Sequence, residues 1–265
     1  MNNTDFYKIT LPFGQNLFNK LFNTIEFENI GNGRMGNHLV KVCDSGIPIV
    51  RTTTKYNIPA HNFSSIHNMI VDSIKDNIQN ENLEYLSSIN FNNALIEVYD
   101  SKYTKMKYHS DQCLDLISNS YIGLFSCYER PDELTEQSIR KLKIKNKITN
   151  EEFAISLTHN SFILFSLPTN SKYFHKIVLE PIPKQKPLKT ENKWLGITFR
   201  ESKTFIQFKN NLPYFANGKL LELATDNQKI EYYKLRGEEN KNVNFIYPQI
   251  NYTLSKADTI IPKDI

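Results

Sequence analysis

Apolar residues recur at helical spacing in two stretches within the first 80 residues of the chain. Between positions 17 and 27, leucine or phenylalanine occupies positions 17, 18, 21 and 22, a spacing that predicts an amphipathic helix. A second helix is predicted to begin at Ser64 or Ser65, since either serine can cap it, and isoleucines at positions 66, 70, 74 and 78 give it one apolar face. The N-terminal part is therefore expected to contribute helices.

From about Asn93 the pattern changes to short apolar runs that turn residues interrupt. Six such runs are rich in β-branched and aromatic residues, and they cover positions 94–99, 121–127, 153–157, 162–165, 174–179 and 195–199. Short strands in this number predict a sandwich or jelly roll rather than alternating strands and helices. A lysine-rich stretch at positions 140–145 alternates charged and apolar residues, which is typical of an exposed strand or hairpin.

The last part of the chain carries the start and stop signals of one more helix. Thr225 and Gln228 form a capping-box pattern, and Gly237 is expected to end the helix after Arg236. We therefore predict a mainly β protein with flanking helices around a double-stranded β-helix (jelly-roll) core. Residues 1–92 would supply helices and a substrate-covering loop, residues 93–208 the core, and residues 209–265 an extension packed on it.

Composition narrows the class of protein without fixing its partner. The 265 residues are 40% hydrophobic and 12% aromatic, as expected of a globular chain. The cysteines Cys43, Cys113 and Cys127 lack paired spacing, so neither a zinc site nor a disulfide framework is indicated. Because no signal peptide or long apolar run is evident, an intracellular location, cytoplasmic or nuclear, is expected. A net charge of +4 permits a DNA or RNA partner but does not require one.

His109 and Asp111 stand two positions apart, so on an extended chain both side chains point to the same face. His175 opens an apolar run much later in the chain and is the candidate third ligand. Two imidazoles and one carboxylate on one side of a metal leave the opposite positions open, as in non-haem Fe(II) oxygenases. A His-x-Asp pair alone is weak evidence, since a surface histidine beside an acid also produces it.

The strand expected at positions 194–200 supports this hypothesis. One face is apolar, and the other carries Trp194, Gly196, Thr198 and Arg200. A guanidinium beside a hydroxyl suits a carboxylate, because arginine binds carboxylates through paired, charge-assisted hydrogen bonds. The Tyr99 hydroxyl is placed to donate to the same group. 2-Oxoglutarate needs such partners at its distal carboxylate while its keto-acid end chelates iron.

The order of these motifs resembles the AlkB family of Fe(II)/2-oxoglutarate dioxygenases over residues 48–200. In that family an Asn-x-Tyr strand precedes His-x-Asp, then a distal histidine, then an Arg-x-Asn-x-Thr-x-Arg strand. By this resemblance His109, Asp111 and His175 match the iron ligands, and Tyr99 and Arg200 match cosubstrate contacts. The segment from Pro48 to Asn57, with Arg51 and Tyr56, is similar to the family's Pro-Arg…Tyr-Gly loop, which helps to cover the substrate base.

Several residues depart from the family pattern. Trp194 and Gly196 stand where the family has arginine and asparagine, so one of two expected arginines is missing. Lys193 offers a second positive charge, but on a regular strand it faces the other way. Glu97 replaces the asparagine of Asn-x-Tyr, and Gln112 follows the motif where nucleic-acid repair members usually have acidic residues. These departures leave the substrate class open.

The resemblance implies that Fe(II), 2-oxoglutarate and O₂ together hydroxylate a C–H bond, with succinate and CO₂ as coproducts. On an N-methyl group the product collapses to formaldehyde, which demethylates the substrate. We therefore predict oxidative demethylation of alkylated bases in DNA or RNA. One alternative is a 2-oxoglutarate-dependent hydroxylase of a protein or small molecule. Another is a jelly-roll binding module that does not catalyse a reaction.

Three further histidines are expected to have ordinary structural roles. His159 falls in a turn between two predicted strands, where a hydrogen bond to the backbone is the simplest role. His61 and His67 flank or lie on the second predicted helix and are interpreted as surface or interface residues. Trp194 is expected to fill the core.

Overall fold

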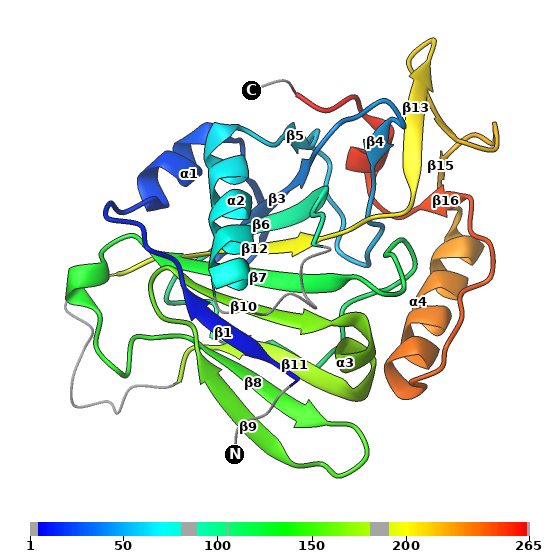
Figure 1. Cartoon of the computed structure of the whole chain (residues 1–265). Coiled ribbons are helices and arrows are strands. Elements are labelled where there is room, and N and C mark those ends of the chain that lie inside the picture. The colour runs from blue at the N-terminus through cyan, green and yellow to red at the C-terminus, as the bar shows by residue number, and fades with distance from the viewer. Residues whose placement is uncertain (1–4, 81–88, 105, 181–190, 264–265) are drawn as a thin grey trace.

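The computed structural model describes residues 5–80, 89–104, 106–180 and 191–263. Its largest element is a mainly antiparallel sheet in which neighbouring strands follow the order β1-β10-β7-β12-β6-β3-β2, with β5 parallel to β3 (Figure 1). These strands are β1 (Tyr7–Thr10), β2 (Glu28–Gly31), β3 (Arg34–Val40), β5 (His61–Asn62), β6 (Asn93–Tyr99), β7 (Tyr121–Tyr128), β10 (Ser161–Ser166) and β12 (Trp194–Arg200). The chain order and the spatial order differ, so most of the pairing joins distant segments.

A second, three-stranded sheet packs against the first. It consists of β8 (Lys141–Asn146), β9 (Glu152–Ser156) and β11 (Tyr173–Val178), in the order β11-β8-β9. Apolar side chains of both sheets form one buried cluster, to which Leu124 and Trp194 contribute from the large sheet and Ile144 and Ile177 from the small one. All six predicted runs are strands of these two sheets. The expected mainly β, jelly-roll fold is thus confirmed.

The lysine-rich stretch forms β8 and pairs with β9 as a hairpin, as expected. Its lysines are only partly buried, whereas Leu142 and Ile144 are almost fully buried in the core between the sheets. The period of two along this strand therefore separates a solvent face from a core face.

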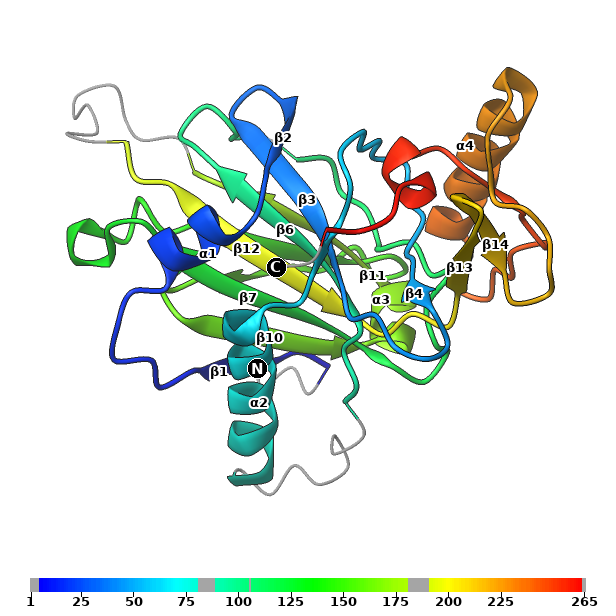
Figure 2. The same ribbon diagram turned by 90° about the horizontal axis from the view of Figure 1, so that it is seen from above.

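Two helices cover the outer face of the large sheet, α1 (Phe18–Thr24) and α2 (Ser65–Asn80) (Figures 1 and 2). Leu21 and Ile70 are fully buried against the apolar face of β12, which carries Leu195, Ile197 and Phe199. The second helix begins at the expected serine. The first ends three residues before the expected limit of position 27, because Ile25 is already extended.

The N-terminal region also contributes strands that the sequence pattern did not predict. β1 pairs with β10, and β3 pairs with β6 over seven residues. The sequence of β3 contains arginine, glycine, asparagine and histidine, which weakens any local strand signal. Pairing with a distant strand therefore determines its conformation. The expected division of the chain at residues 92 and 208 stays a prediction.

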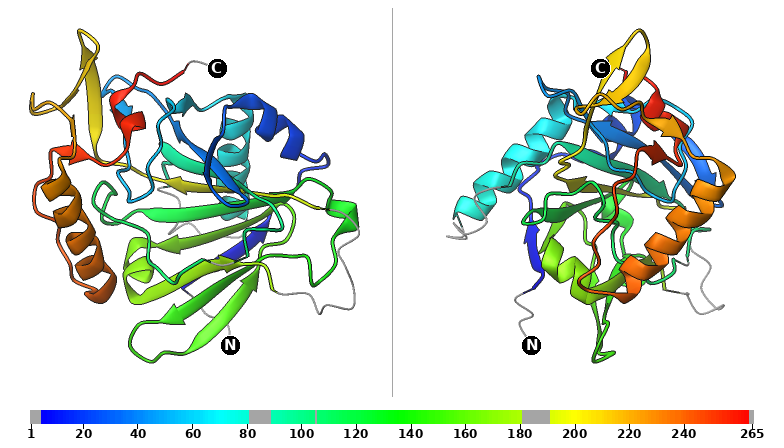
Figure 3. Two further views of the ribbon diagram at one scale, coloured as in Figure 1. Left: turned by 180° about the vertical axis from the view of Figure 1, so that it is seen from behind. Right: turned by 90° about the vertical axis from the view of Figure 1, so that its right-hand side faces the viewer.

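The C-terminal part adds a small sheet, a parallel strand pair and a long helix. The sheet comprises β4 (Ile47–Pro48), β13 (Phe205–Lys209) and β14 (Leu212–Phe215), and the pair comprises β15 (Glu222–Leu223) and β16 (Tyr252–Thr253). The helix is α4 (Asp226–Lys241), which stands on the opposite side of the molecule from α2 (Figure 3). Shorter helical segments are α3 (Leu167–Lys172), η2 (Pro131–Glu133) and η3 (Lys256–Thr259).

The predicted capping box of α4 is present, since the Thr225 hydroxyl and the Gln228 side chain each bond the other's backbone N–H. The expected stop at Gly237 is wrong, because the helix continues to Lys241. Glu239 and Asn240 in this last turn accept hydrogen bonds from the backbone N–H groups of Cys113 and Ser110. These tertiary contacts outweigh the low helix propensity of glycine. Within the described residues, every helix is too short or too polar to cross a membrane.

Candidate metal centre

His109 and His175 face each other across a local antiparallel pairing. The backbone N–H of His109 donates to the carbonyl of His175 over 3.0 Å, and the N–H of His175 donates back over 2.7 Å. His175 belongs to β11, while His109 lies in the segment that follows β6. Two backbone hydrogen bonds between the same two residues fix their side chains on one side of the pair.

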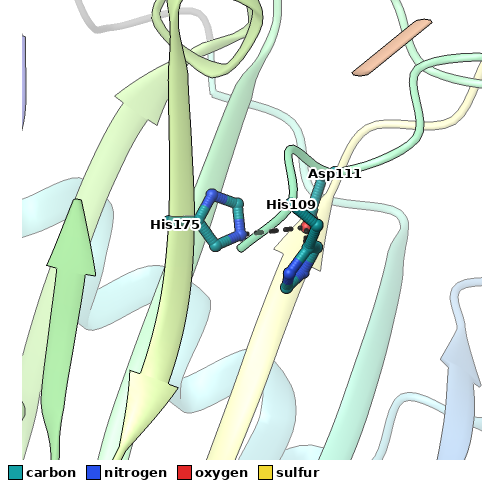
Figure 4. A group of neighbouring side chains, drawn as sticks. All are labelled: His109, Asp111 and His175. Atoms are coloured by element: carbon teal, nitrogen blue, oxygen red, sulfur yellow. Dashed lines mark ion pairs between the residues drawn. The ribbon is translucent and has the colours of Figure 1, made fainter. Parts of the chain in front are cut away.

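Asp111 completes a group of three donor atoms that converge on one point (Figure 4). Its Oδ1 lies 3.3 Å from Nε2 of His175 and 3.9 Å from Nε2 of His109. All three donor atoms lie within 4.8 Å of one another. Metal bonds of about 2.0–2.2 Å at right angles separate neighbouring ligand atoms by about 3 Å. The two separations of 3.3 and 3.9 Å exceed this value by less than about 1 Å. With a small approach of the side chains, the residues present therefore fit a divalent ion held on one face by two imidazoles and a carboxylate, as Fe(II) requires.

The tautomer of His109 is set by its own backbone environment. Its Nδ1 lies 3.0 Å from the carbonyl oxygen of Lys107, so Nδ1 carries the proton and Nε2 keeps a free lone pair. Burial, followed by the nearby His175 ring, lowers the pKa of His109 to about 4. A neutral ring with its lone pair toward Asp111 is the form that binds a metal.

Arg200 orients the carboxylate. Its Nε and Nη2 donate to Oδ2 of Asp111 over 3.0 and 2.7 Å, which leaves Oδ1 directed at the imidazoles. Burial by itself raises the pKa of Asp111, but the Arg200 guanidinium and the two histidines hold that pKa well below its ordinary value. The remaining Nη1 of Arg200 is buried and has no acceptor among the described residues. It is a donor that a bound carboxylate would satisfy.

Asn170, on α3, fixes the backbone at Asp111. Its Oδ1 accepts from the Asp111 N–H over 2.8 Å, and its Nδ2 donates to the Asp111 carbonyl over 3.0 Å. The Ser110 hydroxyl donates to the carbonyl of Tyr173 over 2.8 Å. Because α3 leads directly into β11, the same short stretch of chain supplies His175 and holds the His-x-Asp segment.

The C-terminal helix α4 forms hydrogen bonds with the same His-x-Asp segment. Asn240 Oδ1 accepts from the Ser110 N–H over 3.2 Å, and Glu239 accepts from the Cys113 N–H over 2.7 Å. Arg236 donates to the Ser110 carbonyl and pairs with Glu239. The sequence predicts that this helix packs on the core, but no local pattern indicates that it contacts the metal-binding segment.

We predict that Asn170→Ala weakens Fe(II) binding about 10- to 100-fold, the usual effect of removing a group that orients metal ligands. The two backbone groups of Asp111 lose their partner, so the carboxylate is less well directed. Titration of the apoprotein with Fe(II) under anaerobic conditions measures this loss. Asn227→Ala, at an exposed position of α4, is the control. Unchanged affinity in Asn170→Ala would show that Arg200, α4 and the strand pairing orient Asp111 without Asn170.

A cavity of about 330 Å³ adjoins the three ligands. Tyr99, Thr198 and Arg200, the predicted cosubstrate contacts, all line it, and so do Arg34 and Glu97. The Tyr99 hydroxyl donates to Glu97 Oε2 over 2.6 Å. The sequence-predicted metal and cosubstrate residues thus lie around one cavity, whereas Arg34 was missed because β3 carries no strand signal.

The two predicted substrate contacts lie elsewhere. Arg51 is buried and bonds Asp115 and the carbonyls of Ile250 and Tyr252, and it lines no part of the cavity at the metal. Tyr56 is fully buried with its ring against His38. Residues 52–54 between them do line the cavity. The loop therefore reaches the site, but the two side chains that the resemblance singled out turn into the interior.

Lys193 and the three further histidines, His61, His67 and His159, lie outside the metal centre and contact other parts of the fold. His159 Nδ1 accepts from the backbone N–H of Tyr128 over 3.1 Å, as expected of a turn residue. The surface interpretation of His61 and His67 is wrong, because both are buried and accept backbone hydrogen bonds from Glu26 and Ser64. Lys193 lies over the ring of Phe22, away from the cavity.

Comparison with known proteins matches most of the chain to one family. Residues 34–200 match the family described as the 2OG-Fe(II) oxygenase superfamily. Solved structures of similar shape include OsALKBH1, at 15% identity over 66% of this chain and 84% of that one, with a TM-score of 0.41. A Pseudomonas putida prolyl-4-hydroxylase matches at 9% identity over 74% of this chain and 92% of its own, also with a TM-score of 0.41. The search of curated proteins finds no match.

The match covers β3 through β12, and so includes all three ligands and the strand that ends in Arg200. Members of this family use Fe(II), 2-oxoglutarate and O₂, and the three donor atoms described above fit the metal. The chain belongs to the 2OG-Fe(II) oxygenase superfamily and is an enzyme of the dioxygenase type.

Proposed function

We propose that this oxygenase demethylates alkylated nucleic-acid bases, with 2-oxoglutarate held by Tyr99, Thr198 and Arg200 in the cavity beside the metal. The observation that carries the proposal is the charge of that cavity. Four cationic side chains line it, Arg34, Lys107, Arg200 and Arg236, and the three arginines are paired with Glu97, Asp111 and Glu239. The arginines suit a dicarboxylate cosubstrate, and Lys107, which forms no ion pair among the described residues, suits a phosphate-bearing substrate.

The cosubstrate contacts follow from the unsatisfied donor of Arg200. Its buried Nη1 needs an acceptor, and a carboxylate in the cavity supplies one without disturbing the pair with Asp111. Thr198, two residues earlier on β12, points to the same face and is half-buried there. Apolar side chains such as Leu124, Phe165 and Ile177 line the rest of the cavity and keep bulk water from the reacting groups.

When bound, Fe(II) with 2-oxoglutarate and O₂ supplies an oxidant that hydroxylates a C–H bond, and a hydroxylated N-methyl group releases formaldehyde. The protein positions the methyl carbon and the carboxylate ligand. Lys107, which is exposed beside His109, is placed to meet a backbone phosphate. The cavity volume of about 330 Å³ falls within the range of small-molecule sites. A cavity of this size suits a single base that has flipped out of the base stack.

The test is turnover of oligonucleotides that bear 1-methyladenine or 3-methylcytosine, with Fe(II), ascorbate and 2-oxoglutarate. We expect one succinate for each methyl group lost, and an oligonucleotide affinity that falls as salt rises. Mass spectrometry reads both products, and unmethylated oligonucleotides are the control. Succinate without demethylation would reject a methylated base as the substrate and point to a protein side chain or small molecule. Neither succinate nor demethylation, from protein that has bound iron, would favour a binding module.

A further inference from the structure

We propose that Arg34 binds the distal carboxylate of 2-oxoglutarate, and that Glu97 occupies this position until the cosubstrate enters. The proposal rests on the cosubstrate of the family and on the proposed role of Tyr99. It does not depend on the nucleic-acid substrate. Arg34 would thereby supply the second positive charge that the family pattern expects on β12, where this chain has Trp194.

Trp194 leaves no room for a cation from the start of β12. The indole lies over Gly196, where an added Cβ would meet the ring at 2.1 Å. Its Nε1 donates to the Ser126 hydroxyl over 2.7 Å, and the side chain is only 1% exposed. The ring is locked by packing and by this hydrogen bond, so a positive charge at this end of the cavity must come from another strand.

Arg34 supplies that charge from β3. It stands opposite Tyr99 in the pairing of β3 with β6 and lines the same cavity. Its guanidinium carbon lies 6.0 Å from the centre of the Tyr99 ring and 5.7 Å from that of Tyr103. Arg140 also lies over Tyr99, but it donates to the carbonyls of Asp100 and Tyr103 and does not line the cavity. Arg34 is thus the arginine available to a ligand at this end.

The Glu97 carboxylate already receives the contacts that a ligand carboxylate would need. Arg34 donates to Oε1 through Nε over 2.8 Å and through Nη2, and the Tyr99 hydroxyl donates to Oε2 over 2.6 Å. A guanidinium and a phenol on the two oxygens of one carboxylate form a complete carboxylate site. Its present occupant is a side chain of the protein itself, at the position where the family resemblance expects asparagine.

The two partners of this ion pair should therefore affect cosubstrate binding in opposite directions. Loss of Arg34 removes the anchor, whereas loss of the Glu97 charge removes a competitor and a repulsive neighbour. If the pair were only structural, removing either partner would weaken the site in the same direction. The sign of the second effect separates the two interpretations.

The experiment measures 2-oxoglutarate binding to the Fe(II) protein without O₂, by calorimetry and by the visible charge-transfer band of the chelate. We expect Arg34→Gln to raise the Kd for 2-oxoglutarate about 10- to 100-fold, the usual worth of hydrogen bonds to a charged group. Glu97→Gln should lower that Kd roughly 5-fold, because an unfavourable charge is removed. Arg34→Lys should fall between wild type and Arg34→Gln.

2-Oxopentanoate, which keeps the chelating end and lacks the distal carboxylate, is the matched ligand. Its Kd should be nearly the same in wild type and Arg34→Gln. Arg130→Gln, which breaks a surface pair with Glu133, is the control variant. An equal penalty for both ligands in Arg34→Gln, or weaker 2-oxoglutarate binding in Glu97→Gln, would overturn the proposal. Because no methylated substrate is present, neither result bears on the nucleic-acid hypothesis.

Discussion

Asp111→Asn is expected to abolish Fe(II)-dependent conversion of 2-oxoglutarate to succinate. The substitution keeps the size of the side chain but removes the negative charge that faces two imidazoles and the Arg200 guanidinium. Since removal of an outer group that only orients a ligand costs 10- to 100-fold in metal affinity, loss of the ligand charge should cost more than about 100-fold. Anaerobic Fe(II) titration and succinate formation measure the two effects separately.

The control for this variant is Asp226→Asn, a carboxylate of the first turn of α4 whose side chain is 94% exposed. It should bind iron and turn over 2-oxoglutarate as the wild type does. Circular dichroism and a melting curve establish whether Asp111→Asn is folded. A folded Asp111→Asn protein that retains iron and wild-type succinate formation would rule out the His109, Asp111 and His175 centre.

The parts of the fold that the sequence predicts are those with a strong local period. The runs that became β6, β7, β9, β10, β11 and β12 alternate or bury nearly all their side chains, and their apolar character alone identifies them. The spacing of His109 and Asp111 likewise needs only an extended chain. The third ligand is predictable because His175 stands at the start of one of these runs.

The parts that the sequence does not predict depend on contacts between distant segments. Arg34 reaches the cavity only because β3 pairs with β6, and no local sequence pattern predicts that pairing. The continuation of α4 past Gly237 depends on its bonds to Ser110 and Cys113, more than 120 residues away. A family motif also predicts position without predicting contacts. It matches Arg51 by its place in the sequence, but the direction of the Arg51 side chain is set by its ion pair with Asp115.

The metal centre depends both on local sequence spacing and on contacts between distant segments. Its ligands are identified by local spacing, yet their geometry is imposed by three separate parts of the chain: β11, α3 and α4. Asn170 bonds the backbone at Asp111, and Asn240 bonds that at Ser110. These hydrogen bonds hold in place a segment that is not itself a regular strand. The C-terminal extension is thus a structural part of the site.

Arg51→Ala is expected to lower the free energy of unfolding by about 3–5 kcal/mol, the usual cost of leaving one partner of a buried ion pair alone. The side chains of Arg51 and Asp115 are 4% and 0% exposed, and their closest nitrogen and oxygen atoms lie 2.7 Å apart. Arg51 also donates to the carbonyls of Ile250 and Tyr252, so these two acceptors lose their side-chain donor as well, while the backbone N–H of residue 51 still reaches Asp115 Oδ2. Urea denaturation monitored by circular dichroism measures the change.

Arg130→Ala is the matched control, because Arg130 and Glu133 form an ion pair whose side chains are 35% and 46% exposed. Such a pair contributes less than about 1 kcal/mol. The comparison also decides between two roles for Arg51. A structural arginine lowers stability and leaves the KM of the folded enzyme for a methylated oligonucleotide unchanged. An arginine that covers the substrate base, as the family loop implies, would leave stability within 1 kcal/mol of wild type and raise that KM. Because Asp115 holds the guanidinium in the interior, we expect the first result.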